Sequence, residues 1–164
     1  MEQSFKQSQS GLSKEEKYKA FIEQYKLLIE GETNKMGILA NTTAAIKEAF
    51  GFFWIGFYLV EGDNLLLGPF QGSVACYKIK KGKGVCGTSW DKEQTIVVPD
   101  VDKFEGHIAC SSLSKSEIVV PLFVDNKVIA VLDIDSDELN TFCDIDKKYL
   151  EQTMNILSQT LKNI

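Results

Sequence analysis

The fold is decided by the stretch EIVVPLFVDNKVIAVLDID, which spans residues 117–135. Two runs rich in β-branched and apolar residues flank Asp125-Asn126, a dipeptide typical of tight turns. This pattern predicts a hairpin of two antiparallel strands, at Ile118–Val124 and Lys127–Asp135. Because hairpin connections join antiparallel strands, we expect the sheet to which they belong to be mainly antiparallel.

Three acidic residues stand in or beside these two strands, where apolar residues would be expected. Successive side chains of a strand point to opposite faces, so one face of each strand is wholly apolar. If both apolar faces pack against helices, the opposite face carries Glu117, Asp133 and Asp135. Carboxyl groups crowded there raise the pKa of at least one of them, which keeps a proton available near neutral pH. The alternative interpretation is that these acids are solvated residues at strand ends.

Amphipathic segments at both ends of the sequence supply the expected helices. Ser13 and Glu16 have the spacing of a capping box, and apolar residues recur at helical intervals from there to Gly31. Further helices are predicted at Asn34–Phe50, Val85–Trp90 and Asp144–Leu161. Four more strands are predicted at Phe52–Val60, Leu65–Phe70, Val74–Ile79 and Thr95–Val98.

These elements together predict an α+β fold with a central, mainly antiparallel sheet and the N- and C-terminal helices packed on one of its faces. We expect residues 13–164 to form one domain and residues 1–12 to be a disordered leader. The segment Met1–Ser10 is polar and no run approaches the roughly 18 apolar residues of a membrane span, so a cytoplasmic location without membrane contact is expected.

The charge of the chain limits the ligands that it can bind. Its formal net charge is -5 and every cationic side chain other than the single histidine is a lysine, since the sequence contains no arginine. Scattered acidic residues argue against nucleic acid as a partner. The carboxylate or phosphate of a ligand would have to be held by lysine, backbone N–H groups or a helix N-terminus.

Four cysteines in a reducing compartment are expected to be buried, metal-bound or catalytic. Cys143 beside Phe142 is predicted to be a buried small hydrophobe, an interpretation that also fits Cys76 inside its predicted strand. Cys86 lies near a predicted helix N-terminus, which stabilises a thiolate. Cys110 lies on a polar loop, where burial is least expected.

A zinc site is the alternative use of these thiols. The order Cys76-x9-Cys86-x20-His107-x2-Cys110 offers four ligands but lacks the Cys-x2-Cys knuckle that would define the geometry. The segment Lys81-Gly82-Lys83-Gly84 also lacks the motif of a phosphate-binding loop. Redox chemistry of a thiol on a small molecule is therefore the favoured interpretation.

Several motifs of the chain resemble the free methionine-(R)-sulfoxide reductases, a family in which a GAF domain acts as the enzyme. The resemblance extends from about Phe53 to the last helix, and the three cysteines Cys76, Cys86 and Cys110 have the family's relative spacing. Ser111 departs from the family, which commonly has aspartate after the third cysteine. The matching segments are Trp54-Ile55-Gly56-Phe57-Tyr58, Gly68-Pro69-Phe70-Gln71-Gly72, Ala75-Cys76, Gly82-Lys83-Gly84-Val85-Cys86-Gly87, His107-Ile108-Ala109-Cys110 and the two acidic strands.

The resemblance implies a GAF-like catalytic domain that reduces free methionine-(R)-sulfoxide. A Cys110 thiolate would attack the sulfoxide sulfur and become a sulfenic acid, and Cys76 or Cys86 would close a disulfide with it. One of the three acids would protonate the departing oxygen, and the acids would also hold the substrate ammonium. Trp54 and Tyr58 would line the pocket around the methyl-sulfur end.

The resemblance also implies an external reductant of the thioredoxin type and no tightly bound cofactor. GAF domains often pair through terminal helices, which favours a homodimer. The order in which Cys110 and Cys86 react stays open, as does the proton donor among Glu117, Asp133 and Asp135. The alternative function is a non-catalytic GAF sensor that binds a small ligand such as a cyclic nucleotide, and a zinc-bound interaction module is the third.

Overall fold

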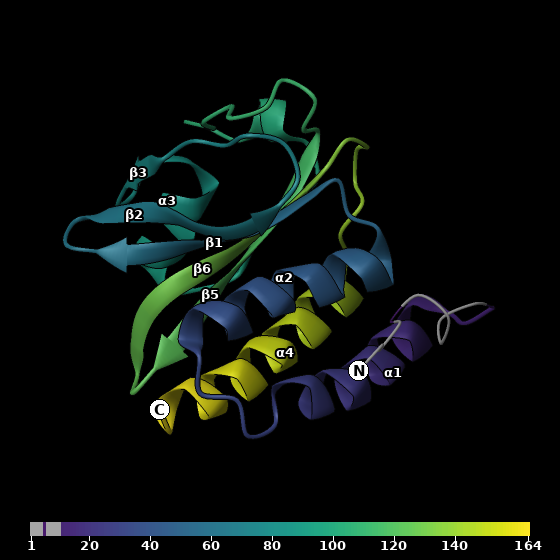
Figure 1. The fold of residues 1–164 in the computed structure, drawn as a ribbon. Helices are drawn as coiled ribbons and strands as arrows, with labels where there is room; N and C mark the ends of the chain where they lie inside the picture. The colour runs from purple at the N-terminus through teal and green to yellow at the C-terminus, as the bar shows by residue number, and fades with distance from the viewer. Residues whose placement is uncertain (1–4, 6–10) are drawn as a thin grey trace.

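A six-stranded sheet forms the centre of the molecule (Figure 1). The computed structural model describes residue 5 and residues 11–164. The strands lie in the order β3-β2-β1-β6-β5-β4, and each bonded pair is antiparallel, as predicted. Their bounds are Trp54–Glu61 for β1, Asn64–Gln71 for β2, Lys78–Lys80 for β3, Ile96–Val98 for β4, Ser116–Val124 for β5 and Lys127–Ser136 for β6.

Within the described residues, three long helices lie on one side of the sheet and a shorter helix covers the other face (Figure 1). On the first side, α2 (Lys35–Phe50) and α4 (Asp144–Lys162) pack against the strands, and α1 (Lys14–Ile29) packs against these two helices. The second face carries α3 (Gly84–Lys92). A 3-10 turn, η2, spans Val101–Lys103. The predicted α+β class and the packing of the terminal helices on one face are confirmed. Of the helices described, none has the length and apolar character that crossing a membrane requires.

The helices begin at the side chains that can cap them. Ser13 Oγ accepts the Glu16 N–H at 3.2 Å and the Glu16 carboxylate accepts the Ser13 N–H at 3.3 Å, which is the predicted capping box. Asn34 caps α2 through the N–H of Gly37. Gly51 ends α2 with a φ of 67°, a left-handed conformation that glycine adopts without steric cost.

The hairpin of residues 117–135 forms as predicted and separates the two faces of the sheet. Asp125 and Asn126 have φ values of 53° and 62°, the geometry of a two-residue turn whose twist matches the flanking strands. The apolar faces of both strands join the core on the helical side of the sheet through Ile118, Val120, Leu122, Ala130, Leu132 and Ile134. The opposite face therefore carries Glu117, Asp133 and Asp135.

The predicted third strand, Val74–Ile79, is wrong over most of its length, because β3 begins only at Lys78 and residues 72–77 form a loop. Val74 and Tyr77 are 89% and 85% exposed, so the run does not alternate between a buried and a solvated face. Cys76 consequently lies in a loop instead of a strand. The apolar residues of this run do not belong to a strand; Val74 and Ala75 instead line a pocket.

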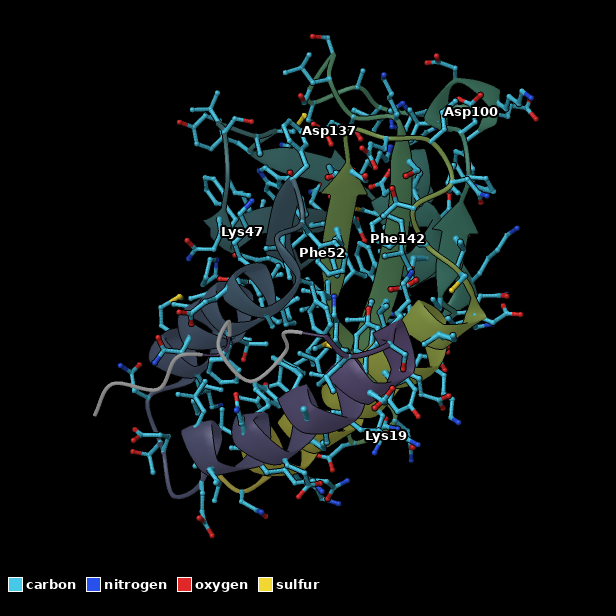
Figure 2. The ribbon with its side chains drawn as sticks, turned by 90° about the vertical axis from the view of Figure 1, so that its right-hand side faces the viewer. Lys19, Lys47, Phe52, Asp100, Asp137 and Phe142 are labelled. Carbon is cyan, nitrogen blue, oxygen red and sulfur yellow. A yellow bond between two sulfur atoms is a disulfide. The ribbon has the colours of Figure 1, made fainter. Side chains whose placement is uncertain are left out.

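Aromatic side chains fill the space between the long helices and the sheet. The rings of Phe52 and Phe142 have centroids 5.5 Å apart, and Figure 2 shows both where the helices meet the strands. Phe5 is buried against Phe21, with ring centroids 5.6 Å apart. Apart from Phe5 and residues 11–12, the predicted leader of residues 1–12 lies outside the described residues.

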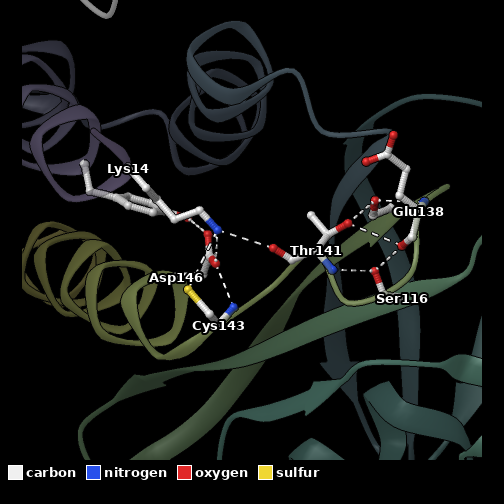
Figure 3. A network of polar contacts seen from close by, with 8 residues as sticks. Lys14, Ser116, Glu138, Thr141, Cys143 and Asp146 are labelled. Atoms are coloured by element: carbon white, nitrogen blue, oxygen red, sulfur yellow. Dashed lines mark hydrogen bonds and ion pairs between the residues drawn. The ribbon is translucent and has the colours of Figure 1, made fainter. Parts of the chain in front are cut away.

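Asp146 joins α1 to α4 through a buried polar network (Figure 3). Its Oδ2 accepts hydrogen bonds from Lys14 Nζ and from the Cys143 N–H, each at 2.8 Å. Its Oδ1 accepts the Tyr18 hydroxyl at 2.6 Å. The predicted burial of Cys143 is wrong, because this residue is the N-cap of α4 and its side chain is exposed at the start of the helix.

The same network reaches the first residue of β5 (Figure 3). Lys14 Nζ donates to the Thr141 carbonyl at 3.3 Å, and the Thr141 N–H donates to Ser116 Oγ at 3.3 Å. Ser116 Oγ in turn donates to the Glu138 carbonyl at 2.6 Å. The helical layer is thereby tied to the strand position immediately before Glu117.

Replacing Asp146 should destabilise the fold strongly. Asp146→Ala removes three hydrogen bonds and the partner of Lys14, so we expect the free energy of unfolding to fall by about 2–4 kcal/mol. The matched control is Asp144→Ala, an exposed acid in the same first turn of α4, which should cost only about 0.3–1 kcal/mol through the helix dipole. Urea denaturation compares the two variants, and equal losses would contradict a specific role for Asp146.

Candidate active site

A pocket opens on the sheet face that the three long helices leave uncovered. Residues of β1, β3, β5, β6 and α3 line it, together with residues from the loops at 72–77 and 104–115, and its cavity has a volume of about 40 Å³. Seven of the eight predicted site residues line this pocket: Trp54, Tyr58, Cys86, Cys110, Glu117, Asp133 and Asp135. The eighth, Cys76, is bonded to Cys110.

The three acids come together because their strands are neighbours in the sheet. Glu117 pairs with Asp135 across β5 and β6, and Asp133 lies two residues along the same face of β6. Glu117 and Asp133 are only 5% and 6% exposed, and Asp135 is partly buried. Asp133 Oδ1 has no hydrogen-bond partner within the described part of the chain. A buried oxygen left in this state is a site for a hydrogen-bond donor supplied by a ligand.

Burial holds protons on these carboxyl groups. It raises the pKa of Glu117 to about 8, with a further contribution from the charge of Asp135. Burial and the charge of Glu117 raise the pKa of Asp133 well above its usual range, and burial and the charge of Asp133 do the same for Asp135. The prediction that crowding raises at least one pKa agrees with this, although desolvation contributes more than repulsion.

Cys86 lies at the bottom of the pocket, in the first turn of α3. It is 4% exposed, and its thiol and one oxygen each of Glu117 and Asp133 lie within 4.8 Å of one another. The expectation that the helix N-terminus stabilises a Cys86 thiolate is wrong, because burial and the neighbouring acids raise the pKa of this thiol well above its ordinary value. Near neutral pH Cys86 is therefore a neutral thiol.

A disulfide between Cys76 and Cys110 joins the two loops at the mouth of the pocket. Their Cα atoms are 5.5 Å apart, and both residues are partly exposed. The bond connects positions 34 residues apart in the sequence, so only the fold brings them together. Cys86 and Cys143 remain free thiols.

Two aromatic residues of β1 hold the loop that carries Cys76. The Tyr58 hydroxyl donates to the Cys76 carbonyl at 3.0 Å, and Trp54 Nε1 donates to the Ser73 carbonyl at 2.9 Å. The Trp54 ring also stacks on Phe70, with centroids 5.4 Å apart. These side chains replace the strand pairing that residues 72–77 lack, and they present apolar ring surface to the pocket.

Gly56 makes room for the Trp54 ring between neighbouring strands. A Cβ atom at Gly56 would lie 2.4 Å from Trp54 Cη2 and 2.5 Å from the Cβ of Phe70. Neither contact can be accommodated without moving the ring or the strand. The glycine in the Trp54-Ile55-Gly56-Phe57-Tyr58 motif therefore leaves room for the Trp54 ring, which lines the pocket.

His107 and Ser114 are site residues that the sequence did not assign to the acids. His107 Nε2 lies 3.7 Å from Glu117 Oε1, and Ser114 Oγ donates to Asp135 Oδ1 at 3.1 Å. Burial lowers the pKa of His107, and the pKa of Glu117 is about 8, so near neutral pH this pair is a polar contact between uncharged groups. Both residues lie on the loop that carries Cys110, which could have marked them as candidate site residues. The sequence does not show which acid each of them contacts.

The geometry does not favour the zinc site considered from the sequence. Cys76 and Cys110 are bonded to each other in this state and therefore offer no thiolate. Cys86, Glu117 and Asp133 are the close donor group of the described chain, but a metal needs its ligands deprotonated and the pKa of each is raised. The arrangement is suited to hold and release protons and to bind a cation with N–H donors.

Comparison with known proteins gives concordant matches. Residues 36–162 match the GAF domain family. The chain is 59% identical over 146 residues to GAF domain-containing protein A of Dictyostelium discoideum, covering 88% of this chain and 92% of the relative. It is 45% identical over 151 residues to the free methionine-R-sulfoxide reductase of Escherichia coli, covering 92% of both chains. The structure of the Neisseria meningitidis free methionine-R-sulfoxide reductase in complex with its substrate superposes with a TM-score of 0.91, at 49% identity and 93% coverage of both chains.

The protonated acids should make the fold less stable as the pH rises. The pKa of Glu117 is 4.5 ordinarily and about 8 in the fold, so between these values the folded chain holds a proton that the unfolded chain has released. The free energy of unfolding then falls with rising pH, by about 1.4 kcal/mol per pH unit for each such proton. We expect Glu117→Gln to make this fall shallower when urea denaturation is followed from about pH 5 to about pH 8.

The matched control for this measurement is Glu105→Gln, an exposed acid on the loop before His107. The free energy of unfolding of this variant should fall with pH as steeply as that of the wild-type protein. A slope that is the same in all three proteins, or a wild-type stability that rises over this range, would contradict the assignment of the proton to Glu117.

Proposed function

Because the chain belongs to the free methionine-(R)-sulfoxide reductase family of GAF-domain proteins, we propose that it reduces free methionine-(R)-sulfoxide to methionine. The observation that carries this proposal is the Cys76–Cys110 disulfide at the mouth of a pocket that contains three protonated acids. Reduction of a sulfoxide requires two electrons for sulfur and a proton for the departing oxygen. The cysteine pair supplies the two electrons, and the acids supply the proton.

The reaction begins with the reduced form of the pair, and Cys110 is the nucleophile. Its sulfur attacks the sulfoxide sulfur while Glu117 or a neighbouring acid protonates the sulfoxide oxygen. As the oxygen passes to Cys110, the substrate sulfur gains two electrons and methionine leaves. Cys110 is oxidised to the sulfenic acid, the reversible first stage of thiol oxidation.

Cys76 is the partner that closes the disulfide. Its thiol attacks the sulfur of the Cys110 sulfenic acid, the S–O bond breaks and one water is released. The 5.5 Å between their Cα atoms supports this assignment over Cys86. Cys86 lies deeper, with a raised pKa that keeps it as the less nucleophilic thiol. In this scheme Cys86 is a pocket residue that takes no part in the disulfide.

The acids also account for a preference for the free amino acid. The ammonium group of free methionine sulfoxide has three N–H donors, and Asp133 Oδ1 is a buried acceptor that lacks a donor within the described residues. Binding of a cation beside these groups lowers their pKa values and favours one ionised carboxylate. A methionine sulfoxide within a peptide has no ammonium group, so it would leave this acceptor unpaired.

The apolar end of the substrate fits the aromatic wall of the pocket. Trp54 and Tyr58 lie on the same face of β1, with ring centroids 6.2 Å apart, and both line the cavity. Sulfur atoms make favourable contacts with aromatic rings. This wall would hold the methyl and sulfur groups while the acids hold the ammonium, which places the sulfoxide between them and next to Cys110.

An external dithiol of the thioredoxin type completes the cycle by reopening the disulfide. The scheme needs no tightly bound cofactor, because the cysteines carry the electrons and the carboxyl groups carry the protons. A reducing compartment such as the cytoplasm would supply the reductant and keep Cys86 and Cys143 as thiols. In such a compartment the state with the Cys76–Cys110 bond is the oxidised intermediate of turnover.

Removing the proposed nucleophile should abolish the reaction. We expect Cys110→Ser to lower kcat/KM for free methionine-(R)-sulfoxide by roughly a thousandfold or more with dithiothreitol as reductant, because a serine hydroxyl cannot carry the electrons. Cys143→Ser is the matched control and should retain full activity, since Cys143 is exposed beside Lys14 in the helical layer. Full activity in Cys110→Ser would refute the assignment. Tight binding of a cyclic nucleotide without sulfoxide turnover would favour the sensor function instead.

Removing the resolving cysteine should separate the first step from the cycle. Cys76→Ser keeps Cys110, so we expect about one methionine per protein in a single turnover without reductant, followed by a loss of thioredoxin-driven cycling. Mass spectrometry should find a sulfenic acid at Cys110, trapped with dimedone. A Cys86–Cys110 disulfide in this variant would show that Cys86 resolves the sulfenic acid when Cys76 is missing. Unchanged thioredoxin-driven cycling would contradict the assignment of Cys76.

A further inference from the structure

Exposed apolar side chains gather on the two loops that the disulfide joins. Of the large hydrophobic side chains exposed in the described part of the chain, half lie within three residues of Cys76 or Cys110. We call these four residues the disulfide collar: Val74 (89% exposed), Tyr77 (85%), Ile108 (39%) and Leu113 (62%). Three residues of chain reach at most about 11 Å, so each collar residue lies close to the sulfur–sulfur bond.

Neither the core nor the pocket accounts for the whole collar. Val74 and Ile108 also line the pocket, but Tyr77 and Leu113 do not. Both of these belong to neither hydrophobic core cluster. Exposed apolar residues that border a reactive bond are suited to contact a second molecule that reacts with this bond.

The chemistry of the disulfide indicates which molecule this is. Exchange with Cys86 or Cys143 would only move the bond to another pair and leave the chain equally oxidised. Two electrons must therefore come from outside, and their donor must reach the sulfur atoms that the collar borders. Cys76 and Cys110 are partly exposed, so a thiolate on a second molecule can approach them.

We propose that the disulfide collar is the docking surface for a protein dithiol of the thioredoxin class, which the proposed function requires as its reductant. The reductant's thiolate attacks one sulfur of the Cys76–Cys110 bond, and the other sulfur leaves and takes up a proton. The second thiol of the reductant then displaces the mixed disulfide and releases the remaining cysteine as a thiol. Two electrons and two protons pass to this chain, and the reductant ends as a disulfide.

The choice of a protein over a small thiol rests on the size and chemistry of the collar. Four exposed apolar side chains on two loops are more than a small thiol can cover, whereas a protein with apolar surface around its reactive thiol can bury them on contact. The contact ends when the electrons have been transferred, so a small interface is sufficient.

The test compares two reductants on one variant. Tyr77→Ser/Leu113→Ser removes the two collar residues that do not line the pocket. We expect kcat/KM for thioredoxin, measured with thioredoxin reductase and NADPH, to fall about tenfold or more because the apolar anchors are lost. Turnover driven by dithiothreitol, which needs no docking surface, should stay within about twofold of the wild-type protein.

Two further variants serve as controls. Leu27→Ser/Met36→Ser removes hydrophobic side chains that are 64% and 56% exposed on α1 and α2, and both activities should be unchanged. Tyr77→Phe/Leu113→Met keeps the collar apolar, so its kcat/KM for thioredoxin should stay near that of the wild-type protein.

Each other outcome overturns the proposal. An unchanged kcat/KM for thioredoxin in Tyr77→Ser/Leu113→Ser would exclude the collar as the docking surface. An equal loss with both reductants would show that the collar supports the pocket and not docking. A wild-type protein that turns over with dithiothreitol but not with thioredoxin would exclude this class of reductant. Failure of the wild-type protein with both reductants would instead refute the proposed function.

Discussion

The burial of three carboxyl groups beside a thiol is the constraint on which the site depends. Ionised carboxylates in this position would be desolvated and would repel one another, so the fold keeps protons on them, with the pKa of Glu117 raised to about 8. The antiparallel pairing of β5 and β6 brings the three acids together. The alternate residues of both strands are apolar and lie in the core on the helical side, so the acids lie on the opposite face. The same alternation therefore builds the core on one face and gathers the protonated acids on the other.

Asp146 shows by contrast what a structural acid looks like in this fold. It is buried, as Glu117 and Asp133 are, but its oxygens accept bonds from Lys14, Tyr18 and the Cys143 N–H. Asp133 Oδ1 has no such donor among the described residues. A fully paired acid stabilises the packing of two helices, whereas an acid with an unpaired oxygen is available to a ligand. The difference separates the helical layer, which supports the fold, from the face that carries the pocket.

The Cys76–Cys110 disulfide connects the chemistry to the loops around the pocket. Both cysteines lie outside regular secondary structure, on segments held by few bonds, such as that from the Tyr58 hydroxyl to the Cys76 carbonyl. The bond therefore joins two loops and no strand of the sheet. The acids, in contrast, stand on β5 and β6, within the paired strands of the sheet.

The sequence by itself determined the hairpin, the capped helices, the face that carries Glu117, Asp133 and Asp135, and the family resemblance, which the comparisons confirm. Each of these follows from periodicity, turn residues or motifs that are local in the chain. Only the tertiary structure decided that Cys76 lies in a loop bonded to Cys110, that Cys86 is a buried neutral thiol, and that Cys143 is exposed. The pairing joins residues far apart in sequence, and burial sets a pKa through all the surrounding elements at once, so neither can be read from a local pattern.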